Sequence, residues 1–182
     1  MADFDQAFSK MIKNEGGYKL HQVKGDRGGI TYAGISKKFH PDWQGWAKIG
    51  RKEYDAELTG MVRVFYLTRF WNQIQGSSIE NQIIAENIFD FAVNAGWRVA
   101  AKIVQVIVGT APDGIIGEIT LGKINEIGNS ENKMAVPLFI AHYALAKMAR
   151  YAEICTRRER SRKFLLGWTK RTLKMASGER YV

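Results

Sequence analysis

Apolar residues recur at helical spacing along most of this chain, and glycines separate the helical stretches. Phe4, Phe8 and Met11 fall on one helical face, and the pair Gly16 and Gly17 follows as a stop signal. The chain has only three prolines in 182 residues, so few positions forbid a helix. This pattern predicts a mainly α protein without internal repeats or flexible linkers.

The periodicity divides the rest of the chain into further helices. Residues 24–34 interrupt the pattern, because glycines and the β-branched Ile30 and Thr31 favour a small β-hairpin or an irregular loop there. We expect one compact domain over residues 1–182, built as a helical fold with that single β or irregular segment. Beyond the first helix, the predicted helices cover residues 52–70, 80–95, 97–108, 118–127, 131–156 and 161–175.

Basic residues are concentrated at the end of the chain. Lys and Arg total 27 against 18 Asp and Glu, a formal charge of +9. Eleven basic and three acidic residues lie in 147–182, so this tail alone carries +8. Such a tail attracts polyanions, which include nucleic acid, anionic membranes and cell-wall polymers. A solvated helix face without a dedicated partner explains the same charge.

The first residues do not resemble a secretion signal. Asp3 and Asp5 stand where a signal peptide carries basic residues. The sole cysteine, Cys155, excludes a disulfide framework and fits a reducing compartment. We therefore expect synthesis in the cytoplasm, and action on a cell wall or in the periplasm only after release through a holin-like pore or another route.

Glu15 is the most informative single residue. Eleven residues separate it from Phe4, a rotation of about 20° beyond three full turns, so it continues the apolar stripe of the first helix. Partial desolvation there favours a protonated carboxyl, as a general acid for glycosidic cleavage requires. Alternatively, Glu15 swings into solvent or pairs with Lys13 or Lys19.

A second carboxylate and a hydroxyl follow in the glycine-rich segment. Asp26 could orient or deprotonate water, or stabilise an oxocarbenium ion, and Thr31 could help to hold that water. Asp26 could instead cap a turn or pair with Arg27, and Thr31 could be an ordinary strand residue.

Together these residues form a recognisable motif. Glu15-Gly-Gly-Tyr18, followed by Asp26-x-Gly-Gly-x-Thr31-x-x-Gly-Ile-Ser36, resembles glycoside hydrolase family 108, a family of phage and bacterial N-acetylmuramidases that includes secretion-activator proteins. The resemblance implies a lysozyme-like fold and cleavage of the β-1,4 MurNAc–GlcNAc bond of peptidoglycan, in a phage endolysin or a secretion-associated lysozyme. It also implies that Glu15 is the catalytic glutamate.

The resemblance extends along the chain. Segments 89–96, 113–120 and 164–171 are similar to the family's Asp-x-x-x-Asn-x-Gly segment, its Asp-Gly-x-x-Gly-x-x-Thr signature and its closing Gly-Trp-x-x-Arg. These matches imply a catalytic lobe over residues 1–96 and a peptidoglycan-associated helical lobe over residues 97–182.

Four further residues are candidates for substrate binding. Asp90 and Asn94 lie four apart on one helix face, where they could line a cleft, and Asp90 is an alternative second carboxylate. A polar pair that anchors a helix end is an equally good explanation. Tyr18 and Tyr32 stand near the motif, and aromatic faces suit sugar rings.

Metal and cofactor sites are not expected. The three histidines His21, His40 and His142 lack partners at ligand spacing, and the sequence contains neither a phosphate loop nor a dinucleotide fingerprint. The expected partner is the peptidoglycan glycan strand, with the basic tail as a possible dock on anionic wall or membrane. No specific nucleic acid is expected. The competing hypothesis is a non-catalytic peptidoglycan-binding or secretion-accessory module. A nucleic-acid binder that uses the basic tail ranks after it.

Overall fold

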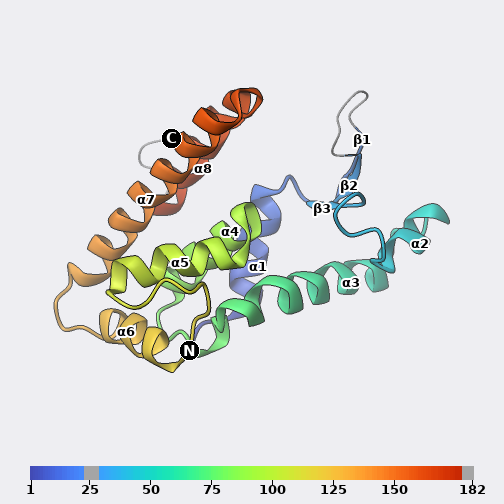
Figure 1. Cartoon of the computed structure of the whole chain (residues 1–182). Coiled ribbons are helices and arrows are strands. Elements are labelled where there is room, and N and C mark those ends of the chain that lie inside the picture. Colours follow the sequence, from blue (N-terminus) through green and yellow to red (C-terminus); the bar gives the residue numbers. More distant parts are fainter. Residues whose placement is uncertain (23–28, 178–182) are drawn as a thin grey trace. The chain divides into compact units, whose positions relative to one another are not determined.

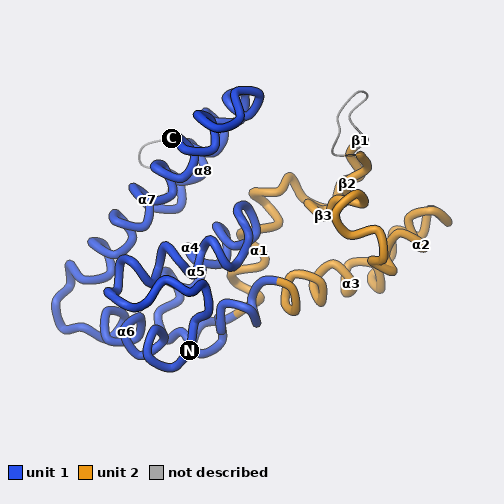
Figure 2. The backbone as a smooth tube through the Cα atoms, in the orientation of Figure 1, with its two compact units in different colours: residues 1–3, 70–182 blue, residues 4–69 orange. Residues whose placement is uncertain are grey.

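The computed structural model describes residues 1–22 and 29–177. The chain divides into two compact units (Figure 2). Unit 2 comprises residues 4–69, and unit 1 comprises residues 1–3 together with the chain from residue 70 onward. The division falls within a π-helical turn, Leu67–Trp71, that follows the last helix of unit 2.

The described part of unit 2 combines three helices with a small sheet (Figure 1). Its helices are α1 (Phe4–Asn14), α2 (Gly45–Gly50) and α3 (Ala56–Tyr66). The strands β1 (Leu20–Gln22), β2 (Ile30–Tyr32) and β3 (Ile35–Ser36) form an antiparallel sheet in that order.

A two-residue turn joins β2 to β3. Tyr32 pairs with Ile35, which leaves Ala33 and Gly34 as the turn, with φ angles of 47° and 80°. Positive φ at both central residues is the geometry of a tight hairpin turn. The Tyr66 hydroxyl of α3 donates a hydrogen bond of 2.8 Å to the Ala33 carbonyl, so the turn is held against α3.

The core of unit 2 lies between α1 and α3. Phe4, Phe8 and Met11 of α1 are buried, as the periodicity predicts, and the Phe8 ring lies 5.9 Å from the ring of Tyr66. Lys48 of α2 forms ion pairs with Asp55 and Glu57, at the start of α3, at 2.9 and 2.6 Å. These contacts join α2 to α3.

Unit 1 is helical in its described part. Short 3-10 segments, η2 (Asn72–Ile74), η3 (Gly76–Ser78) and η4 (Glu159–Phe164), connect the longer helices. Helix α4 (Gln82–Ala95) packs against α5 (Trp97–Val108) and α7 (Ala135–Arg157). Helix α7 also packs against α8 (Leu165–Ser177). Trp71, Phe89 and Tyr143 are fully buried in its core. Helix α6 (Glu118–Gly128) lies between α5 and α7 in the sequence.

The predicted mainly α class with one small β segment is confirmed. Three helices start four residues later than predicted, at Ala56, Ala135 and Leu165, and α4 starts two residues later, at Gln82. Asp55 caps α3 by accepting from the Leu58 N–H, so that helix begins at Ala56 rather than at residue 52. Asn132 accepts from the Met134 N–H, and α7 begins at Ala135 rather than at residue 131. Within the described ranges, no helix is both long and apolar enough to cross a bilayer.

Candidate active site

Glu15 lies at the C-terminal end of α1. Its N–H donates to the Met11 carbonyl, and the Gly17 N–H donates to the Ile12 carbonyl, which closes the helix. The side chain is half-buried, whereas Met11 and Ile12 are fully buried. Glu15 therefore occupies the solvent edge of the apolar stripe, as its spacing from Phe4 predicts.

The turn between β2 and β3 lies against the Glu15 carboxyl. A Cβ placed on Gly34 would lie 3.0 Å from Glu15 Oε2, 3.1 Å from Glu15 Cγ and 2.5 Å from the Tyr66 hydroxyl. Glycine is therefore required here twice over, for this close approach and for its φ of 80°. Tyr66 and Gly34 together form one wall beside the carboxyl.

Thr31 lies in the strand next to this turn. It pairs with His21 on β1 and with Ser36 on β3, and it is half-buried. Asp26, the predicted second carboxylate, lies outside the described residues, as do residues 24–28 of the predicted β segment. The sheet therefore brings the Thr31 strand and Glu15 into one unit, and the role of Asp26 stays a prediction.

The two candidate tyrosines differ in exposure. Tyr18 is 41% exposed, whereas Tyr32 is 4% exposed and packs against the rings of Trp43 and Tyr54, with centroids 6.4 and 6.0 Å away. Burial raises the pKa of both phenols, and the nearby Tyr54 and Tyr18 raise the pKa of Tyr32 further. Only Tyr18 offers a ring face of useful size to a sugar.

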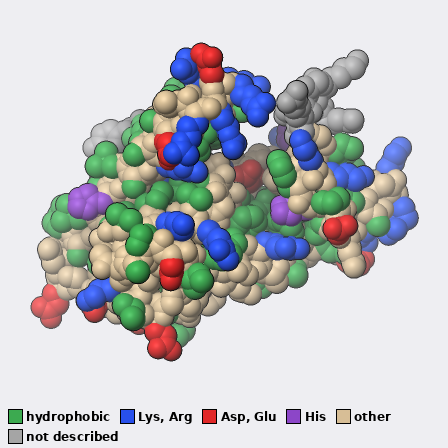
Figure 3. Space-filling view, in the orientation of Figure 1, with side chains coloured by type: hydrophobic (Ala, Val, Ile, Leu, Met, Phe, Trp, Pro, Cys, Tyr) green, Lys and Arg blue, Asp and Glu red, His purple; other side chains and the backbone are tan. Residues whose placement is uncertain are grey.

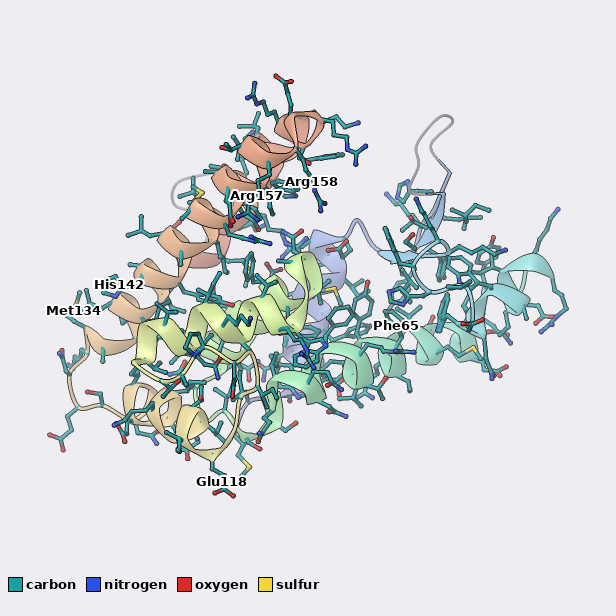
Figure 4. All side chains as sticks on the ribbon, viewed as in Figure 1. Phe65, Glu118, Met134, His142, Arg157 and Arg158 are labelled. Carbon is teal, nitrogen blue, oxygen red and sulfur yellow. The ribbon has the colours of Figure 1, made fainter. Side chains whose placement is uncertain are left out.

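A separate groove of about 800 Å³ runs along α3 in unit 2. Phe39, Trp43 and Phe65 contribute rings to it, and Figure 4 labels Phe65 on α3. The His40 ring meets Phe65 edge-on at 4.8 Å. Burial, with a smaller contribution from Arg69, lowers the pKa of His40. The groove is lined within residues 39–69, so none of the predicted site residues contributes to it.

Asp90 lies in unit 1, where Arg171 of α8 holds it. The guanidinium donates three hydrogen bonds of 2.9–3.1 Å to the two carboxylate oxygens, and the Asp90 side chain is only 7% exposed. This bidentate pair joins α4 to α8. The contacts support the anchoring explanation for Asp90 over a role as second carboxylate.

Asn94 belongs to the same anchored region. Its amide donates at 2.7 Å to the Tyr151 hydroxyl of α7, and the Tyr151 ring stacks on Trp168 of α8 at 4.8 Å. The segments 89–96 and 164–171, which are far apart in the sequence, therefore meet across α4, α7 and α8.

The segment 113–120, the remaining motif of the sequence analysis, begins with a hydrogen-bonded turn. The Gln105 amide donates to Asp113 Oδ1 at 2.7 Å, and its carbonyl accepts from the Gly114 N–H at 2.8 Å. The hydrogen bond from Gln105, followed by one from the Ile115 N–H, lowers the pKa of Asp113. These bonds fix the turn before α6.

Two contributors were missed by sequence reasoning. Tyr66 follows Leu58 and Val62 at helical spacing, and its hydroxyl within an apolar stripe was a signal that it needed a hydrogen-bond partner. Arg171 was quoted only as a motif residue, and only the fold pairs it with Asp90. In the described part of the chain, no three His, Cys, Asp or Glu side chains gather as a metal site would require.

Comparison with known proteins divides the chain into two modules. Residues 8–96 match the family model described as glycosyl hydrolase 108, and residues 99–173 match the one described as a predicted peptidoglycan domain. The structure of Brucella abortus SagA matches with a TM-score of 0.64 and 23% identity, over 97% of each chain. At that identity the likeness concerns the fold alone. A search of curated proteins finds no significant match. The family resemblance predicted from the motifs is confirmed.

Proposed function

We propose that this chain is an N-acetylmuramidase, because residues 8–96 match the glycosyl hydrolase 108 family model. Its substrate would be the β-1,4 bond between MurNAc and GlcNAc in peptidoglycan glycan strands. The peptidoglycan module over residues 99–173 supports that choice of polymer. The proposed setting is phage lysis or secretion-associated opening of the wall.

The position of Glu15 carries the proposal. This carboxyl ends α1 at the edge of the core, beside a turn whose glycine leaves room for it. Partial burial with access from one side suits a general acid, which must hold a proton and meet a large substrate.

In the proposed step, Glu15 donates its proton to the glycosidic oxygen as the bond from that oxygen to MurNAc C1 breaks. The leaving sugar departs as GlcNAc with a free 4-hydroxyl, and positive charge develops at C1. Water then adds to C1 and gives up a proton to the second carboxylate, so the net reaction consumes one water. Tyr18 would offer its exposed ring to a sugar face.

Asp26 is the proposed second carboxylate. Asp90 was the alternative, but its two oxygens accept hydrogen bonds from Arg171, and the side chain is almost fully buried. A carboxylate held in this way is poorly suited to approach a sugar or a water. Thr31, in the strand beside the turn, is the proposed partner for the attacking water.

Digestion of purified sacculi tests the function. We expect mass spectrometry to detect new reducing MurNAc ends after treatment with the wild-type protein. Glu15→Gln should lower the rate of their release by roughly 10²–10⁴-fold, because general acid catalysis contributes about that factor. Glu118→Gln is the matched control, since Glu118 is an exposed residue at the start of α6 (Figure 4).

Three outcomes would contradict the proposal. They are wild-type rates from Glu15→Gln, reducing ends that belong to GlcNAc, and sacculi bound without cleavage. The last of these would identify a non-catalytic binding module.

A further inference from the structure

A small basic pocket lies at the C-terminal end of α7 in unit 1. Its volume is about 280 Å³, and its lining includes Arg150, Arg157 and Arg158. Tyr151 and Trp168 form an aromatic part of the wall, and Asn94 at the end of α4 completes it. Figure 4 labels Arg157 and Arg158 at this end of α7, and Figure 3 shows Lys and Arg side chains gathered there.

Positive charge exceeds negative charge around this pocket. Glu153 pairs with Arg150 at 2.5 Å and with Arg157 at 2.7 Å, so one carboxylate serves two guanidinium groups. Arg158 has no ion-pair partner among residues 1–22 and 29–177. Favourable interaction with the helix C-terminus explains part of this basic cluster.

One donor of a residue that lines the pocket is buried without an acceptor. Arg150 Nε has almost no solvent access, and it has no hydrogen-bond partner within the described ranges. Buried N–H groups that lack a partner are unfavourable, and a helix dipole does not satisfy them. A carboxylate in the pocket would bring negative charge next to the guanidinium of Arg150, whose Nε–H lacks an acceptor.

Contacts between side chains hold the aromatic wall in place. Tyr151 stacks on Trp168 with 23° between the ring planes, and its hydroxyl is fixed by the amide of Asn94. Planar guanidinium groups bind carboxylates through paired hydrogen bonds. The pocket is therefore formed in advance for a small, planar anion next to apolar atoms.

We propose that this pocket binds a carboxylate of the peptidoglycan stem peptide, an inference that rests on peptidoglycan being the substrate. Stem peptides carry free carboxylates beside short aliphatic side chains, which matches the arginines and the aromatic wall. Most of the lining lies within residues 99–173, the region that matches the peptidoglycan module. A lipid surface would also contact the exposed residues Arg160 and Lys163, which do not line the pocket.

Titration with a soluble peptide tests the inference. The probe is the tripeptide L-alanyl-γ-D-glutamyl-diaminopimelate, followed through the NMR signals of the Trp168 indole N–H and the Asn94 amide. We expect saturable shifts, and at least about tenfold weaker binding by the same peptide with its carboxylates amidated, since a charge-assisted hydrogen bond contributes about that factor.

Variants locate the binding site. Arg150→Gln and Arg158→Gln should each weaken tripeptide binding about tenfold, because each removes a donor from the pocket. Arg160→Gln is the matched control: it removes the same charge from an exposed position outside the lining, and should change the affinity less than about twofold. A native NMR spectrum checks the fold of each variant.

Several results would overturn the inference. Equal binding of the amidated peptide would remove the role of the carboxylates, and an equal loss in Arg160→Gln would reduce the effect to general charge. Shifts caused only by inorganic phosphate, or only by phosphatidylglycerol vesicles, would assign the pocket to phosphate or to lipid. The probe contains no glycosidic bond, so binding without sacculus cleavage would contradict only the muramidase proposal.

Discussion

Unit 2 and unit 1 each contain a carboxylate that the sequence motifs single out, and the two have opposite surroundings. Glu15 in unit 2 is half-buried at a helix end, beside a glycine turn that leaves space for it. Asp90 in unit 1 is nearly inaccessible and accepts three hydrogen bonds from one guanidinium.

The difference in access indicates which carboxylate is suited to catalysis and which to holding helices together. A general acid must exchange its proton and touch the substrate, so it needs access. A buried carboxylate paired with Arg171 joins two helices. We therefore propose a catalytic task for Glu15 and a structural one for Asp90.

The largest effect on stability is expected at the Asp90 pair. Arg171→Met leaves the Asp90 carboxylate buried without its counter-ion, which should lower the free energy of unfolding by roughly 3–5 kcal/mol. Urea denaturation followed by circular dichroism measures this change. The double variant Asp90→Leu with Arg171→Met should regain part of the loss, because it removes both charges of the pair together. A double variant no more stable than the single one would contradict this account of the pair.

A smaller effect, dependent on pH, is expected at Lys147. This buried side chain lies over the Tyr143 ring at 4.6 Å, and its ammonium is 3.4 Å from the Asn87 carbonyl. Burial, aided by Arg171 and opposed by Asp90, lowers the pKa of Lys147 from 10.5 to about 8. Between these two pH values the unfolded chain binds more protons than the folded one, so stability should rise with pH.

Comparison with Lys147→Met isolates that contribution. From pH 8 to 9.5, the free energy of unfolding of the wild type should rise by on the order of 2 kcal/mol relative to the variant. Measurements stop there because burial raises the pKa values of Tyr143 and Tyr151, whose ionisation in the unfolded chain opposes the trend near pH 10. Parallel pH profiles for the two proteins would rule out Lys147 as the source.

A loss of stability similar in size to the Lys147 effect is expected in unit 2, at Gly34. Gly34→Ala places a methyl group against Tyr66 and Glu15 at a positive φ, which should cost about 1–3 kcal/mol of stability. Displacement of the Glu15 carboxyl should also slow sacculus cleavage by on the order of 10²-fold.

Gly109→Ala is the matched control for Gly34→Ala. Gly109 has a φ of 73°, and a Cβ there would meet no atom within 4 Å, so it incurs the backbone cost alone. This control should cleave at the wild-type rate. Equal loss of cleavage in both variants would show that contact with Glu15 is not the cause.

Much of the fold could be predicted from periodicity. The step from Phe4 to Met11 located α1 and its buried face, and Gly96 marked the break between α4 and α5. Helix starts were harder to predict. The side chains of Asp55 and Asn132 accept hydrogen bonds from backbone N–H groups that follow them, so each helix begins after that residue. Helix α2 has only six residues, too few for a periodic signal.

The site could be predicted only in part. Glu15 is local to one helix, so its position at the core edge followed from the spacing of its neighbours. The wall beside it depends on Tyr66, which the chain brings to Ala33 from 33 residues away. Pairing of Asp90 with Arg171 spans 81 residues, and local spacing holds no information on such a contact.

The most direct test measures two quantities on two variants. Sacculus cleavage and the free energy of unfolding are compared for Glu15→Gln and Asp90→Asn. The account predicts that Glu15→Gln loses roughly 10²–10⁴-fold in cleavage rate with its stability changed by less than about 1 kcal/mol. It predicts that Asp90→Asn loses stability yet cleaves sacculi wherever it is folded. Wild-type cleavage by Glu15→Gln, or a folded and inactive Asp90→Asn, would contradict it.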